Sequence, residues 1–102
     1  PSKAPDDVRC APLTSQSLQI SWKSPPAAFA NGNIQGYKLT YEPVLPESWN
    51  AIDEMEVRKT ASMTMTLAGL RKYTNYSIQV LAYTRVGDGI PSRTMYCRTK
   101  ED

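Results

Sequence analysis

Two residue types decide which chemistry this sequence can carry out: it has two cysteines, Cys10 and Cys97, and no histidine. Without histidine, neither a Ser-His-Asp nor a Cys-His catalytic triad can form within the chain. A zinc site would need unusual ligands, and the long interval between the cysteines excludes a Cys-x-x-Cys redox motif. Two interpretations of the cysteines remain. They form a disulfide, or they stay reduced and buried and pack as small apolar residues.

Asp53, Glu54 and Glu56 form an acidic cluster that resembles a pair of catalytic carboxylates. Acid–base catalysis needs such groups in a cleft, in environments that move their pKa values apart. Charged residues are also common on edge strands, where they discourage pairing between molecules. We expect this second role, a solvated strand edge. Because the sequence also lacks histidine, a metal-binding cluster and a phosphate-binding loop, we expect no enzyme activity, no metal and no cofactor.

The basic residues are scattered among the acidic ones, and the net charge is only +2. A charge this small does not indicate nucleic acid or an anionic membrane as a partner. Arg58-Lys59 and Arg71-Lys72 could together bind heparan sulfate, but we expect an ordinary solvated surface. No apolar run approaches the roughly 18 residues of a membrane helix, so the domain itself is expected to be soluble.

Asn75-Tyr76-Ser77 is an acceptor sequence for N-glycosylation in a secreted protein. Asn75 directly precedes a residue that is expected to point inward, so its own side chain should point outward. An unmodified surface asparagine is the alternative, because so short a sequence often occurs by chance. We expect Asn75 to carry a glycan when the protein is made in a eukaryotic secretory host.

The stretch Arg85-Val86-Gly87-Asp88-Gly89 resembles an integrin-binding sequence. Val86 interrupts the contiguous Arg-Gly-Asp that integrin ligands use. Two glycines spaced in this way are better explained as the tight turn of a hairpin. The sequence therefore predicts a structural turn here.

The elements that position these residues are predicted to be short strands. Apolar and polar residues alternate with a period of two, as on a half-buried strand, in Leu18–Trp22, Tyr37–Tyr41, Met63–Leu67 and Tyr76–Ala82. Val8–Cys10 and Met95–Cys97 are shorter versions, and the mixed spacing of residues 47–60 suggests one further strand near Met55–Arg58. Proline and glycine separate these runs, at Pro25-Pro26, Asn31-Gly32, Pro43, Pro46, Gly69, Gly87, Gly89 and Pro91. About seven short strands with such turns suggest an all-β antiparallel sandwich.

Several motifs follow one another at characteristic distances. They are Trp22 with Pro25-Pro26, Ile34-x-Gly36-Tyr37-x-Leu39-x-Tyr41, Leu70-x-x-x-Thr74-x-Tyr76-x-Ile78-x-Val80-x-Ala82, and Gly87-x-Gly89-x-Pro91-Ser92. Together they resemble a fibronectin type III domain over essentially the whole chain, although that family usually has proline where Lys72 stands. The resemblance implies a seven-stranded immunoglobulin-like antiparallel sandwich. We assign residues 6–100 to it and expect residues 1–5 and 101–102 to be linkers within a longer protein.

Within this family, Val8-Arg9-Cys10, the stretch Tyr73–Val80 and Tyr96-Cys97 are similar to repeats of the Down syndrome cell adhesion molecule group. The similarity implies a non-catalytic extracellular module of a neuronal cell-adhesion and axon-guidance receptor, which acts as a spacer and a protein-interaction domain. Its partners would be neighbouring immunoglobulin-like and fibronectin type III domains and a homophilic protein partner, with the parent chain anchored in the plasma membrane. The alternatives are a direct ligand-binding domain of a netrin-receptor, receptor-phosphatase or cytokine-receptor type, or an intracellular muscle-type array domain.

The resemblance also implies roles for single residues. Tyr76 matches the tyrosine corner of such sandwiches, where the hydroxyl bonds to backbone near Gly69 or Leu70. The expected core is centred on Trp22 and also contains Tyr37, Leu39, Leu70, Tyr76, Ile78 and Val80.

The first and last strands can lie near each other in such a fold, and the positions of Cys10 and Cys97 in their alternations point inward. An oxidising compartment then favours a disulfide between them, and closing so long a loop would stabilise the fold by roughly 4–5 kcal/mol. Phe29 and Trp49 are expected either to cap the core or to anchor a partner.

Overall fold

The computed structural model describes residues 4–24, 34–49 and 54–101. Phe29 and Asp53, which the sequence singled out, lie outside these residues. The described residues form seven strands and one short helical turn. The strands are β1 (Asp6–Thr14), β2 (Ser17–Lys23), β3 (Gly36–Pro43), β4 (Glu56–Thr60), β5 (Thr64–Leu67), β6 (Asn75–Tyr83) and β7 (Met95–Arg98), and the 3-10 helix η2 spans Glu47–Trp49.

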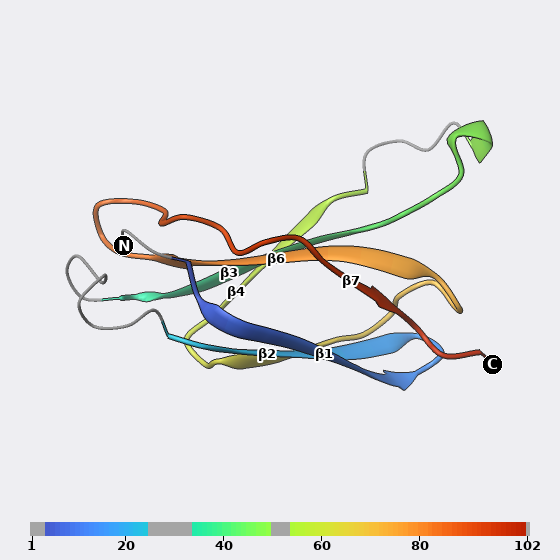
Figure 1. Cartoon of the computed structure of the whole chain (residues 1–102), viewed down its shortest axis with the longest axis horizontal. Coiled ribbons are helices and arrows are strands. Elements are labelled where there is room, and N and C mark those ends of the chain that lie inside the picture. The colour runs from blue at the N-terminus through green and yellow to red at the C-terminus, as the bar shows by residue number, and fades with distance from the viewer. Residues whose placement is uncertain (1–3, 25–33, 50–53, 102) are drawn as a thin grey trace.

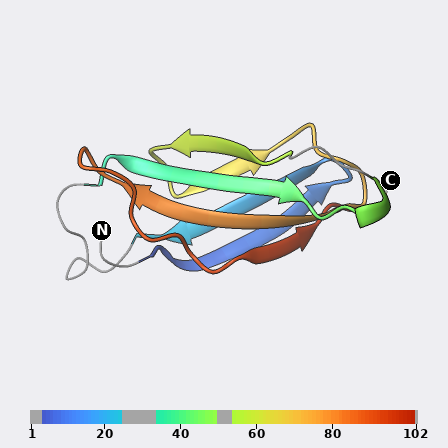
Figure 2. The same ribbon diagram turned by 90° about the horizontal axis from the view of Figure 1, so that it is seen from above.

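The strands form two antiparallel sheets that lie one above the other (Figure 1). One sheet has the order β1-β2-β5 and the other has the order β4-β3-β6-β7. Figure 2 shows the strands of both sheets running close to the long axis of the molecule. The predicted seven-stranded antiparallel sandwich is thus confirmed.

Alternation of side chains along the strands builds the core between the sheets. In β6, Tyr76, Ile78, Val80 and Ala82 are all buried, whereas the residues between them are only half-buried. The same pattern holds in β2 and β3, because successive side chains on a strand point to opposite faces. The buried apolar residues are Leu18, Ile20, Trp22, Tyr37, Leu39, Tyr41, Leu67, Leu70, Tyr76, Ile78, Val80, Ala82 and Cys97.

The sequence was least informative between residues 47 and 60. A strand was expected near Met55–Arg58, and the structure places β4 at Glu56–Thr60 instead. Met63 was expected to share an inward face with Met65, yet 47% of it is exposed. The reason is that β5 begins only at Thr64, so Met63 belongs to the short turn after β4.

Two buried polar side chains replace bonds of the sheet ladder. The Thr99 hydroxyl accepts a hydrogen bond from the Thr74 N–H at 2.9 Å and donates one to the Arg71 carbonyl at 2.8 Å. Ser92 accepts a bond from the Val80 N–H at 3.0 Å in the same way. Since buried polar groups need partners, these two side chains fix the segments on either side of β7 against β6.

The molecule is elongated, with extents of 42 × 27 × 18 Å. β1 starts toward one end of the long axis, and the segment after β7 lies at the other end (Figure 1). Within the described ranges, no helix is long and apolar enough to cross a membrane.

Candidate functional site

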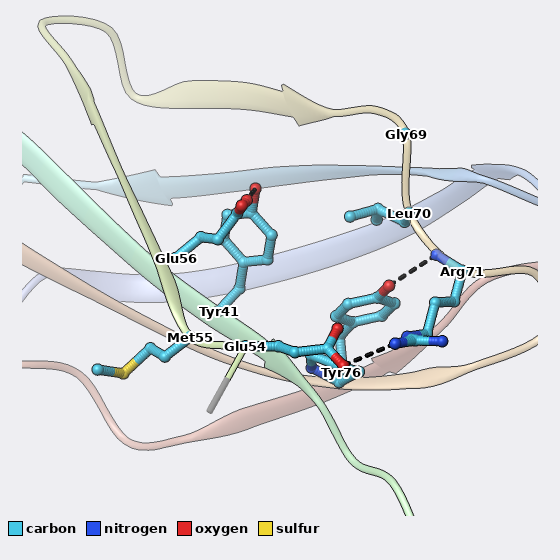
Figure 3. A pocket seen from close by; sticks show the side chains of 9 residues that line it. Tyr41, Glu54, Met55, Glu56, Gly69, Leu70, Arg71 and Tyr76 are labelled. Atoms are coloured by element: carbon cyan, nitrogen blue, oxygen red, sulfur yellow. Dashed lines mark hydrogen bonds and ion pairs between the residues drawn. The ribbon is translucent and has the colours of Figure 1, made fainter. Parts of the chain in front are cut away.

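A cavity of about 450 Å³ opens between β4 and the segment that connects β5 to β6 (Figure 3). Its walls come from β3, β4 and β6 of the four-stranded sheet, from the residues just before β4 and from the segment that follows β5. The lining residues are Tyr41, Pro43, Glu54, Met55, Glu56, Gly69, Leu70, Arg71 and Tyr76.

The tyrosine and the glutamate on the β4 side of this cavity are directly bonded. The Tyr41 hydroxyl donates a hydrogen bond to Glu56 Oε2 at 2.6 Å, and the Arg58 guanidinium lies 5.8 Å from the centre of the Tyr41 ring. Burial of the phenol, together with its bond to the Glu56 carboxylate, raises the pKa of Tyr41 to about 12. Tyr41 therefore stays neutral and holds the Glu56 side chain beside the inner face of β4.

On the other side of the cavity, Arg71 makes two contacts that Figure 3 shows as dashed lines. Its guanidinium lies 2.6 Å from Glu54 Oε2, and its backbone N–H donates to the Tyr76 hydroxyl at 2.7 Å. The sequence predicted this tyrosine bond near Gly69 or Leu70. It is found one residue later, at Arg71, after the turn in which Gly69 has φ +69°.

These contacts leave no arrangement suited to catalysis in the cavity. Glu54 is paired with Arg71, and Glu56 is bonded to Tyr41 and lies 3.3 Å from the Arg58 guanidinium, so the two carboxylates are engaged with different partners. In the part of the chain that the structure describes, no three His, Cys, Asp or Glu residues lie close enough to hold a metal ion. The cavity is best described as an opening between β4 and the segment that follows β5.

Cys10 of β1 and Cys97 of β7 form a disulfide, with 6.3 Å between their Cα atoms. These strands lie at the edges of different sheets, so the bond joins the two layers covalently on the side opposite the cavity. The Lys100 N–H donates to the Thr14 carbonyl at 3.2 Å and brings the same two segments together. The disulfide thus closes one side of the sandwich.

Asn75 begins β6 and is half-buried. It pairs with Arg98 of β7, and its backbone carbonyl accepts a hydrogen bond from the Val44 N–H at 2.8 Å. Because Tyr76 is buried, the alternation of β6 puts Asn75 on the outer face of the four-stranded sheet. A glycan on Asn75 remains a prediction, and it would stand at one end of this outer face.

The outer face of the four-stranded sheet carries two apolar side chains that sequence reasoning had not assigned. Tyr96 of β7 is 63% exposed and Val57 of β4 is 49% exposed. Thr40 and Gln79 lie between the two strands in neighbouring register positions. Tyr96 directly precedes the inward-pointing Cys97, and this alternation was the sequence signal that could have placed Tyr96 on the outer face.

The stretch at residues 85–89 forms a turn between β6 and the segment before β7. The Thr84 N–H donates to the Gly87 carbonyl at 2.9 Å, and the Gly89 N–H donates to the Ala82 carbonyl at 2.7 Å. The carboxylate of Asp88 lies 2.7 Å from the ammonium of Lys38. Asp88 is thus engaged within the domain, as expected for a structural turn.

The basic residues do not gather as a heparan sulfate site would require. Arg58 and Lys59 point to opposite faces of β4, with Arg58 over the Tyr41 ring and Lys59 over the Tyr83 ring. Arg71 is paired with Glu54. Trp49, at the end of η2, is 58% exposed and does not cap the core.

Comparison with known proteins gives consistent results. The family described as "Fibronectin type III domain", a family of non-catalytic modules, matches residues 3–98. The chain is 58% identical over 102 residues to "Cell adhesion molecule Dscam2" of Drosophila melanogaster, and 41% identical over 103 residues to "Cell adhesion molecule DSCAML1" of Homo sapiens. The alignments cover the whole chain but only 5% of each relative. A solved structure, the FN5 domain of Drosophila Lar, is 31% identical with a TM-score of 0.75, and the match covers 96% of both chains. The chain belongs to the fibronectin type III domain family.

Proposed function

We propose that this domain is an extracellular module of a neuronal cell adhesion molecule of the Dscam type, in which it acts as a spacer and offers surfaces for protein contacts. The observation that carries the proposal is the alignment of the whole chain, at 58% identity, with part of a relative named as a cell adhesion molecule. The disulfide adds support for an extracellular position, because disulfides persist in oxidising compartments and are rare in the cytosol. It also disfavours an intracellular array domain.

The spacer role rests on the shape and rigidity of the sandwich. The domain is 42 Å long, and the start of β1 and the segment after β7 lie toward opposite ends of that axis. The disulfide joins the two sheets, so the length that this domain itself contributes would vary little. The direct partners at the two ends are then neighbouring immunoglobulin-like or fibronectin type III domains of the same protein, and the parent chain is anchored in the plasma membrane.

A domain-replacement experiment separates the two roles. Cells that express the full-length receptor are compared with cells in which this segment is deleted, and with cells in which another fibronectin type III domain of the same length replaces it. Cell aggregation is measured at matched surface expression. We expect deletion to weaken aggregation, and we expect replacement to restore only part of it, because replacement restores spacing without the surface of this domain. Full aggregation after deletion would contradict the proposal.

A further inference from the structure

One edge of the four-stranded sheet has backbone groups that are directed away from the fold. The Val44 N–H bonds to the Asn75 carbonyl at 2.8 Å, and bonded pairs alternate in an antiparallel ladder. Counting back along β3, the positions that bond to β4 are therefore Tyr37, Leu39 and Tyr41, opposite Thr60, Arg58 and Glu56. Val57 and Lys59 lie between these pairs, so their N–H and C=O groups point to the open side of β4.

Two side chains of opposite charge flank Val57 along this edge. Glu56 precedes Val57 and Arg58 follows it. If β4 lies antiparallel to β4 of a second copy with Val57 opposite Val57, each Glu56 comes to lie opposite an Arg58 of the second copy. Two ion pairs then form on the inner face, and the two half-exposed valines meet on the outer face. In this register, the charge pattern of β4 in one copy is complementary to the charge pattern of β4 in the other.

We propose that β4 pairs with β4 of a second copy of this domain, in antiparallel orientation and centred on Val57. The Val57 N–H and C=O of each copy then bond to those of the other copy. The two four-stranded sheets become one continuous sheet with the order β7-β6-β3-β4-β4-β3-β6-β7. The proposal goes beyond the adhesion function, because adhesion as proposed above does not specify any surface.

The other sheet edges fit self-association less well. β1 carries Pro12 and an irregular start at Asp7, which has φ +54° and a shift of register. β7 is joined to β1 by the disulfide. β5 is only four residues long, and in Figure 2 it is set behind β4 (yellow-green), which lies at the outer margin of the molecule. A second copy can therefore approach β4 without first meeting another described strand.

The charges also favour a second copy over an unrelated strand. Charged residues normally protect an edge strand from pairing. An incoming strand of uniform charge would lie opposite a like charge at either Glu56 or Arg58, and a neutral strand would leave both without a new partner. If the second copy were shifted along β4 by one residue, its inner-face side chains would lie beside the outer-face side chains of the first copy. Within one copy Arg58 already lies 3.3 Å from Glu56 Oε2, and pairing with a second copy adds an oppositely charged neighbour to each of these side chains. The edge is thus selective for a copy of itself.

Few residues meet in this interface, so the isolated domain should associate weakly, in the class of small transient contacts. Many domains presented together on two membranes would strengthen it through effective concentration. Because the strands run close to the long axis, the two partners point in opposite directions along that axis. Such an arrangement suits receptors that meet from opposing cells.

A charge-exchange experiment tests the proposal with the isolated domain. The dissociation constant of the dimer is measured by sedimentation equilibrium for the wild type, Glu56→Arg, Arg58→Glu, and an equimolar mixture of the two variants. Each variant alone places like charges opposite each other twice, so we expect its dissociation constant to rise about tenfold or more. In the mixture, arginines of one variant face glutamates of the other, and we expect dimers between the two variants at about the wild-type affinity.

Arg85→Glu is the matched control, since it changes the net charge by the same amount at an exposed turn, and it should dimerise like the wild type. Val57→Pro removes a donor that points to the open side without removing a bond to β3, so it should abolish dimers while the domain stays folded. A monomeric wild type at millimolar concentration would overturn the proposal. So would single variants that dimerise normally, or a mixture that fails to recover affinity.

Discussion

The backbone N–H of Arg71 donates a hydrogen bond to the hydroxyl of Tyr76 across 2.7 Å. This bond joins the segment after β5 to the start of β6, so it connects the three-stranded sheet to the four-stranded sheet on the side that has no disulfide. Together with the Cys10–Cys97 bond on the other side, it fixes how the two layers lie on each other.

Tyr76→Phe is expected to destabilise the domain by about 1–3 kcal/mol, because the Arg71 N–H loses its acceptor in a partly buried place. The free energy of unfolding is measured by urea denaturation. Tyr73→Phe is the matched control: Tyr73 is 54% exposed, and its change should stay within about 0.5 kcal/mol. Equal effects of the two substitutions would show that the Tyr76 bond does not stabilise the fold.

The phenol of Tyr41 should titrate later than an ordinary tyrosine, since burial and the Glu56 carboxylate raise its pKa from 10.0 to about 12. The unfolded chain loses this proton first as the pH rises, so the contribution of neutral Tyr41 to stability is complete below pH 10 and is lost between pH 10 and about 12. Phenolate absorbance is recorded for the wild type and Tyr41→Phe, and the difference curve should have its midpoint near 12. A midpoint near 10.0 would mean that Tyr41 is not held in this environment.

Gly36 is expected to resist substitution although it does not lie in a turn. A Cβ atom at this position would lie 2.9 Å from the Thr60 carbonyl oxygen and 2.9 Å from the Tyr83 hydroxyl. Gly36→Ala should therefore destabilise the domain by about 1–3 kcal/mol through overpacking. Adding Tyr83→Leu should restore only part of this loss, because the Thr60 backbone oxygen stays in place. Full recovery would place the whole conflict at Tyr83.

Asn75 should carry an N-linked glycan when the domain is secreted from mammalian cells. Its position in the alternation of β6 places it on the outer face of the four-stranded sheet, and Ser77 completes the acceptor sequence. Peptide mass spectrometry before and after enzymatic deglycosylation measures the occupancy. Ser77→Ala removes the acceptor sequence but keeps Asn75, and it should abolish the modification. An unmodified Asn75 peptide from the wild type would contradict the prediction.

The strands could be predicted from the sequence because a period of two is a local signal. Tyr76, Ile78 and Val80 reveal their inward face without any knowledge of the rest of the chain. β4 was predicted with shifted bounds because a short edge strand buries little and so shows weak alternation.

The contacts between distant segments could not be predicted in this way. Glu54 meets Arg71 only because β4 and the segment before β6 lie on the same open side. Thr99 is buried because it reaches back to Thr74 and Arg71, and nothing in its own sequence neighbourhood indicates this. The charges of Glu56 and Arg58 could not be related to an interface from the sequence, because that step needs β4 to be an edge strand with backbone groups directed to its open side.

We propose that this disulfide-closed fibronectin type III module operates outside the cell. Intact mass of the domain secreted from mammalian cells, deglycosylated and measured before and after reduction, tests it most directly. We expect the unreduced protein to lack two hydrogen atoms relative to the reduced one, with no thiol that reacts with an alkylating reagent after unfolding. Two alkylated cysteines in the unreduced, unfolded chain would contradict the account.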